Sequence, residues 1–202
     1  MIIDTVSYKR FINELNVRNV IGSTVLKLKS ENGGKSPVII YDSQGINNFH
    51  DKQRLQLSLE GKNGLNGTIY TFNTLEELSK YFRLDYNKVK DAADSYNKLM
   101  ASGKDTEFNK DVDAMKGAAI IKAPFYAMIV NPRITYTPGG VRINTNAEVL
   151  SLDTGKPIPG LFACGEVTGG IHGESRLTAG SSPDCGTFGL ISAENIDKRQ
   201  RI

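Results

Sequence analysis

Hydrophobic and polar positions recur with different periods along the first third of the chain. Residues 2–15 mix apolar and polar side chains and predict a strand followed by a turn, and residues 17–29 predict a helix. The β-branched run at residues 37–41 predicts a buried strand. Residues 42–67 are polar and rich in glycine, and the glycine spacing is not that of a dinucleotide-binding turn. We therefore expect a loop over these residues.

Two further helices are indicated by residues that cap helix starts. Thr74 and Glu77 have the spacing of a capping box, in which each side chain satisfies a free amide, so a helix is expected from here to about residue 82. Asp85 is the next N-cap candidate, and apolar residues follow it at helical spacing until Gly103. This second pattern predicts an amphipathic helix with one buried face.

The composition changes in the last 80 residues, which are richer in glycine and in short apolar runs. Residues 125–130 predict a strand, and residues 141–150 alternate well enough for a pair of strands. We expect a turn at 157–160, a short buried strand at 161–164 and a final helix over 184–197. The predicted fold class is mixed, either α+β or α/β.

Composition places the chain among soluble globular proteins. Of the 202 residues, 39% are hydrophobic and 23% are charged, and the formal net charge is +3. Basic and acidic residues are interleaved, which argues against a nucleic-acid partner. No apolar run approaches the ~20 residues of a membrane span, and the start lacks the basic and apolar regions of a signal peptide. We expect no membrane partner and a cytoplasmic or soluble organellar location.

Cys164 and Cys185 are the only two cysteines of the chain. Their separation fits neither a C-x-x-C redox motif nor the ligand pattern of a zinc site. We therefore expect two buried free thiols and no metal site.

A glycine-rich segment follows the last predicted strand. Glycines let a backbone approach a ligand closely, so residues 165–173 (GEVTGGIHG) favour a cofactor-binding surface, with a plain loop in a barrel or sandwich as the alternative. Ser181 and Ser182 then precede a helix, and Pro183 suits its first turn. The free amides of such a helix start can stabilise an anionic group, although simple helix capping explains these residues as well.

These segments resemble a known protein family. Residues 160–173 (GLFACGEVTGGIHG), then Arg176 and Leu177, then residues 187–189 (TFG), resemble the C-terminal FAD-binding stretch of the soluble fumarate reductase flavoproteins. This family includes the flavocytochrome c fumarate reductases and is related to succinate dehydrogenase flavoprotein subunits. Residues 9–18 (KRFINELNVR) resemble a segment of the family's capping domain.

The resemblance covers essentially the whole chain in the family's order, so it also implies a domain organisation. Residues 1–123 correspond to a capping, or substrate-clamp, domain that is incomplete at its N-terminus. Residues 124–202 correspond to the C-terminal portion of a Rossmann-like FAD-binding domain.

The family's reaction assigns roles to two arginines. A flavin hydride goes to one alkene carbon of fumarate while an arginine of the capping domain protonates the other carbon, and Arg18 matches that arginine. Arg176 matches a second arginine, which clamps a substrate carboxylate with its planar fork. Without the resemblance, both would be interpreted as surface or ion-pair residues.

The substrate loop departs from the family pattern. Thr135 and Tyr136 lie in the loop that presents a substrate-binding histidine, and Tyr136 stands at the histidine position. A phenol can donate a hydrogen bond to a carboxylate but carries no positive charge at neutral pH, so the acid can be fumarate or a related enoate. His172 matches a family histidine, for which we expect a place on the substrate or flavin side, with a backbone-bonded core histidine as the alternative. Ala179 is one of two residues that stand where the family usually has glycine.

FAD is the implied cofactor, and several residues match its binding surface. They are Gly165, Glu166, Gly169, Gly170, Ser181 and Ser182. Glu166 corresponds to the carboxylate expected to contact the ribityl or adenosine hydroxyls, and the helix start at the two serines can face the N1–C2=O edge of the reduced flavin.

The G-x-G-x-x-G turn that holds the FAD pyrophosphate in such proteins is missing from the sequence. We therefore expect a further N-terminal segment or chain to supply it. Two hypotheses follow. The first is an FAD-dependent reductase of fumarate or a related unsaturated acid, with a small dicarboxylate or enoate as substrate. The second is a non-catalytic fragment or partner module of such a flavoprotein.

Overall fold

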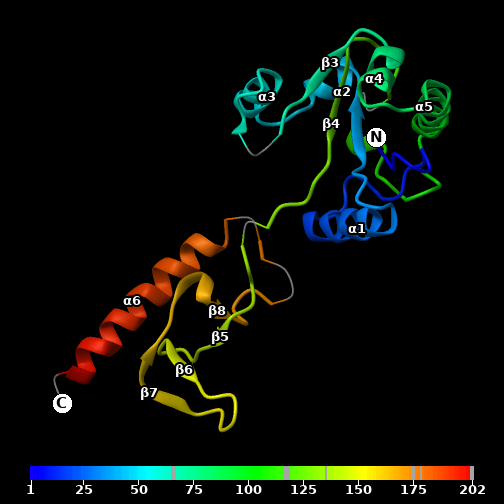
Figure 1. Ribbon diagram of the computed structural model, residues 1–202. Coiled ribbons are helices and arrows are strands. Elements are labelled where there is room, and N and C mark those ends of the chain that lie inside the picture. The colour runs from blue at the N-terminus through cyan, green and yellow to red at the C-terminus, as the bar shows by residue number, and fades with distance from the viewer. Residues whose placement is uncertain (65–66, 116–118, 135, 174–175, 178, 201–202) are drawn as a thin grey trace. The chain divides into compact units, whose positions relative to one another are not determined.

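The chain forms two compact units, Met1–Arg133 and Ile134–Ile202. The computed structural model in Figure 1 describes residues 1–64, 67–115, 119–134, 136–173, 176–177 and 179–200. The division falls later than the predicted boundary at 123/124, because the strand that follows this point pairs within the first unit. The mixed α/β character is confirmed.

The first unit is built on a four-stranded antiparallel sheet with the order β1-β2-β4-β3. Its strands are β1 (Ile2–Ile3), β2 (Val38–Tyr41), β3 (Tyr70–Phe72) and β4 (Phe125–Ile129). Its helices are α1 (Arg18–Glu31), α2 (Ser43–Asn47), α3 (Lys52–Leu59), α4 (Leu75–Tyr81), α5 (Tyr86–Ala101) and the 3-10 helix η2 (Asp113–Met115). The strands predicted near residues 2, 37–41 and 125–130 are thus confirmed.

The core of this unit lies between the sheet and helices α4 and α5, which pack on each other. Its large, fully buried side chains include residues of β1, β2, α4 and α5: Ile3, Val38, Ile40, Leu78, Val89 and Tyr96. Burial of such apolar side chains is the main favourable term in folding. The apolar face predicted for the helix after Asp85 is therefore confirmed.

Side-chain caps fix where the helices begin. Thr74 Oγ1 accepts a hydrogen bond from the Glu77 amide at 3.0 Å, and Glu77 Oε2 accepts one from the Asn73 amide at 2.9 Å. The Asp85 carboxylate accepts from the amides of the second and third residues after it. Both predicted N-caps are confirmed.

The loop predicted over residues 42–67 is wrong, because helices α2 and α3 lie within it. The Asp42 carboxylate accepts from two amides of α2, and the Asp51 carboxylate accepts from the Arg54 amide of α3. Both helices are short and bury a single side chain each, Ile46 and Ser58. Because these segments show so little apolar periodicity, the two capping aspartates were the sequence feature that could have indicated the helices.

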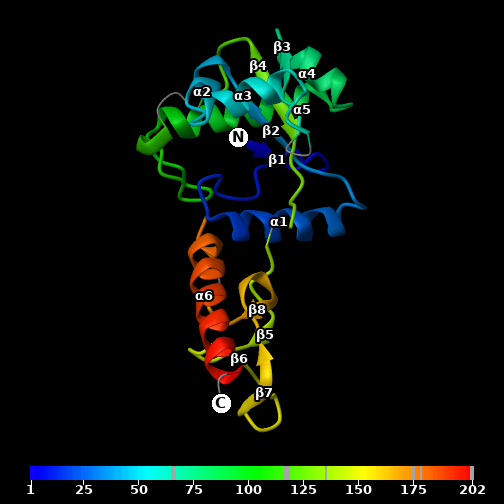
Figure 2. The same cartoon turned by 90° about the vertical axis from the view of Figure 1, so that its left-hand side faces the viewer.

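The second unit consists of two small sheets and one long helix. Its elements are β5 (Val141–Arg142), β6 (Glu148–Leu150), β7 (Pro157–Phe162), the 3-10 helix η3 (Gly165–Val167), β8 (Thr168–Gly169) and α6 (Ser181–Gln200). Helix α6 confirms the predicted final helix and runs beside this unit's strands in Figure 2. Asn195 Nδ2 of this helix donates to the Asn146 carbonyl. No helix of the described residues has both the length and the apolar character needed to cross a membrane.

Strand pairing in this unit differs from the prediction. The stretch 141–150 does not form a ladder with itself: strand β5 pairs in parallel with β8, and β6 pairs antiparallel with β7. Within this stretch, one isolated bridge joins Ile143 to Val149. The turn predicted at 157–160 is wrong, because these residues form most of β7, and β7 is largely exposed in this chain. Both cysteines are free as expected, but Cys185 is exposed and Cys164 is only half-buried.

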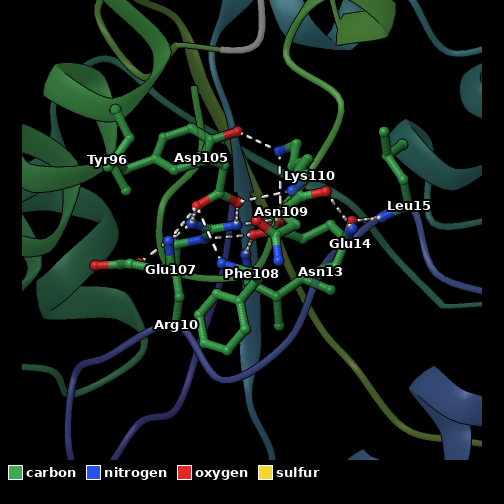
Figure 3. A network of polar contacts seen from close by, with 12 residues as sticks. Arg10, Asn13, Glu14, Leu15, Tyr96, Asp105, Glu107, Phe108, Asn109 and Lys110 are labelled. Carbon is green, nitrogen blue, oxygen red and sulfur yellow. Dashed lines mark hydrogen bonds and ion pairs between the residues drawn. The ribbon is translucent and has the colours of Figure 1, made fainter. Parts of the chain in front are cut away.

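A buried ionic network joins the start of the first unit to the segment after α5 (Figure 3). The Arg10 guanidinium donates to both oxygens of Asp105, at 3.0 and 2.7 Å, and to both oxygens of Glu14, at 3.1 and 2.9 Å. Lys110 Nζ lies 3.2 Å from Glu14 Oε2 and donates to the Tyr96 hydroxyl. The side chains of Arg10, Glu14 and Asp105 are at most 7% exposed. Buried charges require such pairing, because an unpaired one is strongly destabilising.

These contacts determine the pKa values of the two carboxyl groups. Burial alone would raise the pKa of Glu14, but hydrogen bonds from Arg10 and nearby positive charges lower it from 4.5 to about 2. Hydrogen bonds from Arg10 also lower the pKa of Asp105 to about 2. Since both folded-state values are depressed, the carboxylates stabilise the fold above their ordinary pKa values, and this stabilisation is lost as pH falls toward 2.

We predict that the free energy of unfolding, measured by urea denaturation at pH 7, 5 and 3, falls steeply below pH 5. Arg10→Gln should lower it at pH 7 by about 3 kcal/mol and flatten its dependence on acid pH, because the buried carboxylates lose their main donor. Lys90→Gln is the matched control, since the Lys90–Asp94 pair is half-exposed on both sides and should contribute far less to the free energy of unfolding than the buried network does. If the free energy of unfolding of Arg10→Gln fell with acid pH as steeply as that of the unaltered protein, Arg10 would not be the group that lowers the pKa values of Glu14 and Asp105.

Candidate functional site

Four polar side chains meet at the start of α6 in the second unit. Asp184 Oδ2 lies 3.1 Å from His172 Nε2 and accepts a hydrogen bond from the Tyr136 hydroxyl at 3.4 Å. The Tyr136 hydroxyl is also 3.4 Å from His172 Nε2, and the two rings meet edge to face with centroids 5.7 Å apart. The Arg176 guanidinium carbon lies 4.5 Å from the centroid of the Tyr136 ring. We call Tyr136, His172, Arg176 and Asp184 the α6 cluster.

Arg176 is oriented by several contacts. It stacks on Tyr136, and its Nη1 donates to the Leu177 carbonyl at 3.1 Å and to Ser181 Oγ at 3.4 Å. Stacking on an aromatic face and donation to neutral oxygens leave the positive charge without a carboxylate partner among the residues that the structure describes. Such a guanidinium can bind an external carboxylate.

Tyr136 is half-buried, and its electrostatic surroundings favour the neutral phenol. Burial and the negative charge of Asp184 raise the pKa of Tyr136 above its ordinary value. At this position the side chain therefore carries no charge, and its one O–H donor already has Asp184 as an acceptor.

The glycine-rich segment forms a surface close to the Tyr136 loop. A Cβ on Gly169 would lie 2.5 Å from the Gly140 nitrogen, and a Cβ on Gly140 would lie 2.1 Å from the Val167 carbonyl oxygen. Only glycine permits this approach of two backbones. Glu166 Oε1 accepts from the Thr137 amide at 2.8 Å and supplies a second link between the same two segments.

The conformation of this surface suits a close-lying cofactor. Gly165 (φ +76°) and Gly170 (φ +87°) both adopt the left-handed conformation, and the space that a Cβ would fill at Gly170 is open. Glu166 is exposed, so its second carboxylate oxygen can accept from a ligand hydroxyl. These residues could therefore hold FAD, and the roles that the sequence predicted for them stay predictions.

Ser181 and Ser182 lie in the first turn of α6, which begins earlier than the predicted start at residue 184, so the expectation that the two serines precede the helix is wrong. The Ser181 hydroxyl accepts from Arg176, and the Ser182 amide donates to the Ala179 carbonyl at 3.1 Å. Ala179 has φ +64°, a conformation that favours glycine. The predicted substrate residue Thr135 lies outside the described residues.

Arg18 belongs to the first unit, whereas the other candidates belong to the second. It is the first residue of α1 and is exposed, and the N-cap residue Val17 makes no side-chain cap. Val17 is 61% exposed and Leu26 is 57% exposed, so α1 presents apolar as well as charged side chains.

The sequence prediction missed Asp184, which contacts both Tyr136 and His172. The side chain is 3% exposed, and its second oxygen, Oδ1, is buried without a hydrogen-bond partner among the described residues. Its position in the first turn of a predicted helix was a weak signal, because acidic residues are common there for reasons of stability alone.

An apolar cavity of about 480 Å³ opens on the second unit. It lies between β7 and α6, and its apolar lining includes Leu161, Val167 and Ile196. These three side chains are 46%, 58% and 39% exposed in this chain. Apolar surface of this kind usually marks a contact with another part of a protein.

Comparisons with known proteins identify the family to which this chain belongs. Residues 1–182 match the protein family described as the FAD binding domain. An acrylate reductase flavoprotein subunit from Shewanella woodyi is 35% identical over 95% of this chain and 36% of its own length. A fumarate reductase (cytochrome) from Shewanella frigidimarina is 35% identical over 94% of this chain and 30% of its own length. The structure of the open conformation of a flavocytochrome c3 fumarate reductase matches with a TM-score of 0.73 and 36% identity, over 98% of this chain and 32% of that one.

The chain thus spans about a third of the length of the relatives it matches. The resemblance to fumarate reductase flavoproteins, noted from the motifs, is confirmed.

We predict that Gly169→Ala lowers the stability of the second unit by about 1 to 3 kcal/mol, because the new methyl group must push the Gly140 backbone away. Gly186→Ala is the matched control, since nothing lies within 4 Å of its Cβ position, and it should be neutral or stabilising by up to about 1 kcal/mol in a helix. Thermal unfolding followed by circular dichroism checks both. Equal melting temperatures would contradict the close approach of the two segments.

Proposed function

We propose that this chain, which belongs to the family of FAD-binding domains, is part of an FAD-dependent reductase of fumarate or a related unsaturated carboxylic acid. FAD is the cofactor of this family of reductases. The observation that carries the proposal is the α6 cluster, in which Tyr136 and Arg176 lie together with His172 of the glycine-rich segment. These three residues were predicted as substrate residues from motifs up to 40 positions apart in the chain.

Arg176 is the proposed anchor for the substrate carboxylate. Its planar fork suits bidentate binding, and the stack on Tyr136 with the hydrogen bond to the Leu177 carbonyl restricts its orientation. Tyr136 and His172 line the same position and orient the rest of the acid. A substrate held in one orientation reacts faster than a free one, since much of the entropy loss has already occurred.

Arg18 is the proposed proton donor. Bound FAD supplies the hydride, and a side chain must then supply the proton to the neighbouring carbon. Arginine is a weak acid, so Arg18 requires a geometry that favours the transfer and a partner that returns the proton. We assign the first unit to the capping, or substrate-clamp, domain and the second unit to the C-terminal part of a Rossmann-like FAD-binding domain.

The residues proposed to hold FAD are those of the glycine-rich segment and the start of α6. Gly165, Gly169 and Gly170 allow close approach, and Glu166 can accept hydrogen bonds from cofactor hydroxyls. Ser181 and Ser182 lie where the free amides of α6 can interact with an electron-rich edge of the flavin.

A further segment is proposed to complete the FAD site. The apolar cavity between β7 and α6 and the exposed side chains around it suit a contact with another part of the protein. The matched relatives are about three times as long as this chain, which leaves room for such a segment. The alternative is a non-catalytic module, which would neither retain FAD nor reduce an enoate.

We predict that Arg18→Ala in the FAD-loaded protein lowers kcat for fumarate or acrylate by about 1,000-fold, with FAD absorbance unchanged, because only the proton donor is lost. The assay is oxidation of reduced viologen after removal of unbound FAD. Arg54→Ala is the control, since Arg54 is an exposed helical arginine of the same unit.

The outcomes separate the alternatives. Full turnover in Arg18→Ala would reject Arg18 as the acid. Bound FAD without turnover on any unsaturated acid would reject the reductase proposal. Failure to retain FAD, with or without a supplied N-terminal segment, would favour the non-catalytic module.

A further inference from the structure

We propose that Asp184 is a positioning residue that makes the Tyr136 end of the site select a neutral substrate group, so that the enzyme prefers an unsaturated monocarboxylate to a dicarboxylate. This inference rests on the proposed function and deepens it by defining the substrate class. It concerns Asp184, which neither the motifs nor the resemblance singled out.

The first step is the location of the hydrogens in the α6 cluster. A carboxylate oxygen can only accept, so the hydrogen between His172 and Asp184 belongs to His172 Nε2. The single hydroxyl hydrogen of Tyr136 is likewise directed at Asp184 Oδ2, because a carboxylate is a stronger acceptor than the other contact of this hydroxyl, His172 Nε2. Both donors of the Tyr136–His172 pair therefore point toward Asp184.

The consequence is that the Tyr136 end of the cluster offers acceptors. The Tyr136 oxygen presents its lone pairs outward, and Asp184 Oδ1 is a buried acceptor without a partner among the described residues. A substrate carboxylate has only acceptors as well, so it finds no donor there. A neutral group that is apolar or carries an N–H or O–H makes no such mismatch.

Charge acts in the same direction. Arg176 is the cation of the cluster, and it is assigned to the first carboxylate. A second carboxylate near Tyr136 would approach the buried negative charge of Asp184, with only a neutral phenol between them. Like charges in a partly buried site repel strongly, and a histidine in place of Tyr136 could offset the repulsion by carrying a proton.

The kinetic test compares kcat/KM for acrylate and fumarate in the FAD-loaded protein. The unaltered protein should prefer acrylate by about tenfold or more, since one carboxylate is accommodated and two are not. Asp184→Asn removes the charge and keeps the shape, and Tyr136→His adds a group that can carry positive charge. Each substitution should shift the ratio of kcat/KM for acrylate to kcat/KM for fumarate by about tenfold in favour of fumarate.

Glu194→Gln is the matched control, because it removes one exposed carboxylate from the same helix. It should leave the ratio within about twofold, as expected for a screened surface charge. An unaltered protein that uses both acids equally, or an Asp184→Asn protein that loses activity on both acids in equal proportion, would overturn the inference. No turnover with either acid would instead overturn the proposed function.

A second measurement needs neither turnover nor the Asp184 variant to fold. The chain has two histidines, His50 and His172, so ¹⁵N-NMR of the ring nitrogens in His50→Gln reports on His172 alone. We expect a hydrogen on Nε2 of His172. A neutral ring with its hydrogen on Nδ1 would remove the bond to Asp184 and overturn the inference.

Discussion

The Arg10 guanidinium holds the first unit together by joining two stretches of chain, residues 10–14 and 105–110, that share no regular hydrogen bonding. One planar group satisfies Asp105 and Glu14 at once, and Lys110 completes the neutralisation of Glu14. Because the loop after α5 is fixed in this way, the segment that leads from β1 into α1 has a defined path. Arg18 lies at the start of that helix, so the position of the proposed proton donor depends on a charge cluster eight residues earlier.

A single carboxylate has a comparable role in the second unit, on a smaller scale. Asp184 is almost completely buried in the first turn of α6 and contacts side chains from two other segments. In the first unit the buried carboxylates of Glu14 and Asp105 are paired with Arg10 and Lys110, so the network is closed in the sense that each buried charge has a partner of opposite charge. In the α6 cluster one carboxylate oxygen is left without a donor among the described residues, and the positive charge of Arg176 is held by stacking. A closed network is suited to stability, whereas an incomplete one is suited to binding a ligand.

Local signals in the sequence predicted the elements that depend on local interactions. Thr74 and Asp85 act within three residues of themselves, and the apolar face of α5 repeats with the helical period. Helices α2 and α3 were missed because their polar residues lack that period. The pairing of β5 with β8 and the partners of Asp184 depend on contacts between residues 12 to 48 positions apart, which no local pattern encodes. Tyr136, His172 and Arg176 were identified from the family motif, and their mutual geometry required the structure.

The contact between Gly140 and Gly169 joins the two sides of the proposed site mechanically. One segment carries Tyr136 and the other carries Glu166 and His172, and their backbones touch without an intervening side chain. Side chains can change rotamer independently, whereas two backbones in contact transmit displacement directly. A shift of the cofactor-facing segment would therefore move the substrate-facing loop by a similar amount. A substitution of either glycine during evolution would therefore alter cofactor affinity and substrate preference at the same time, and the two properties are expected to evolve together.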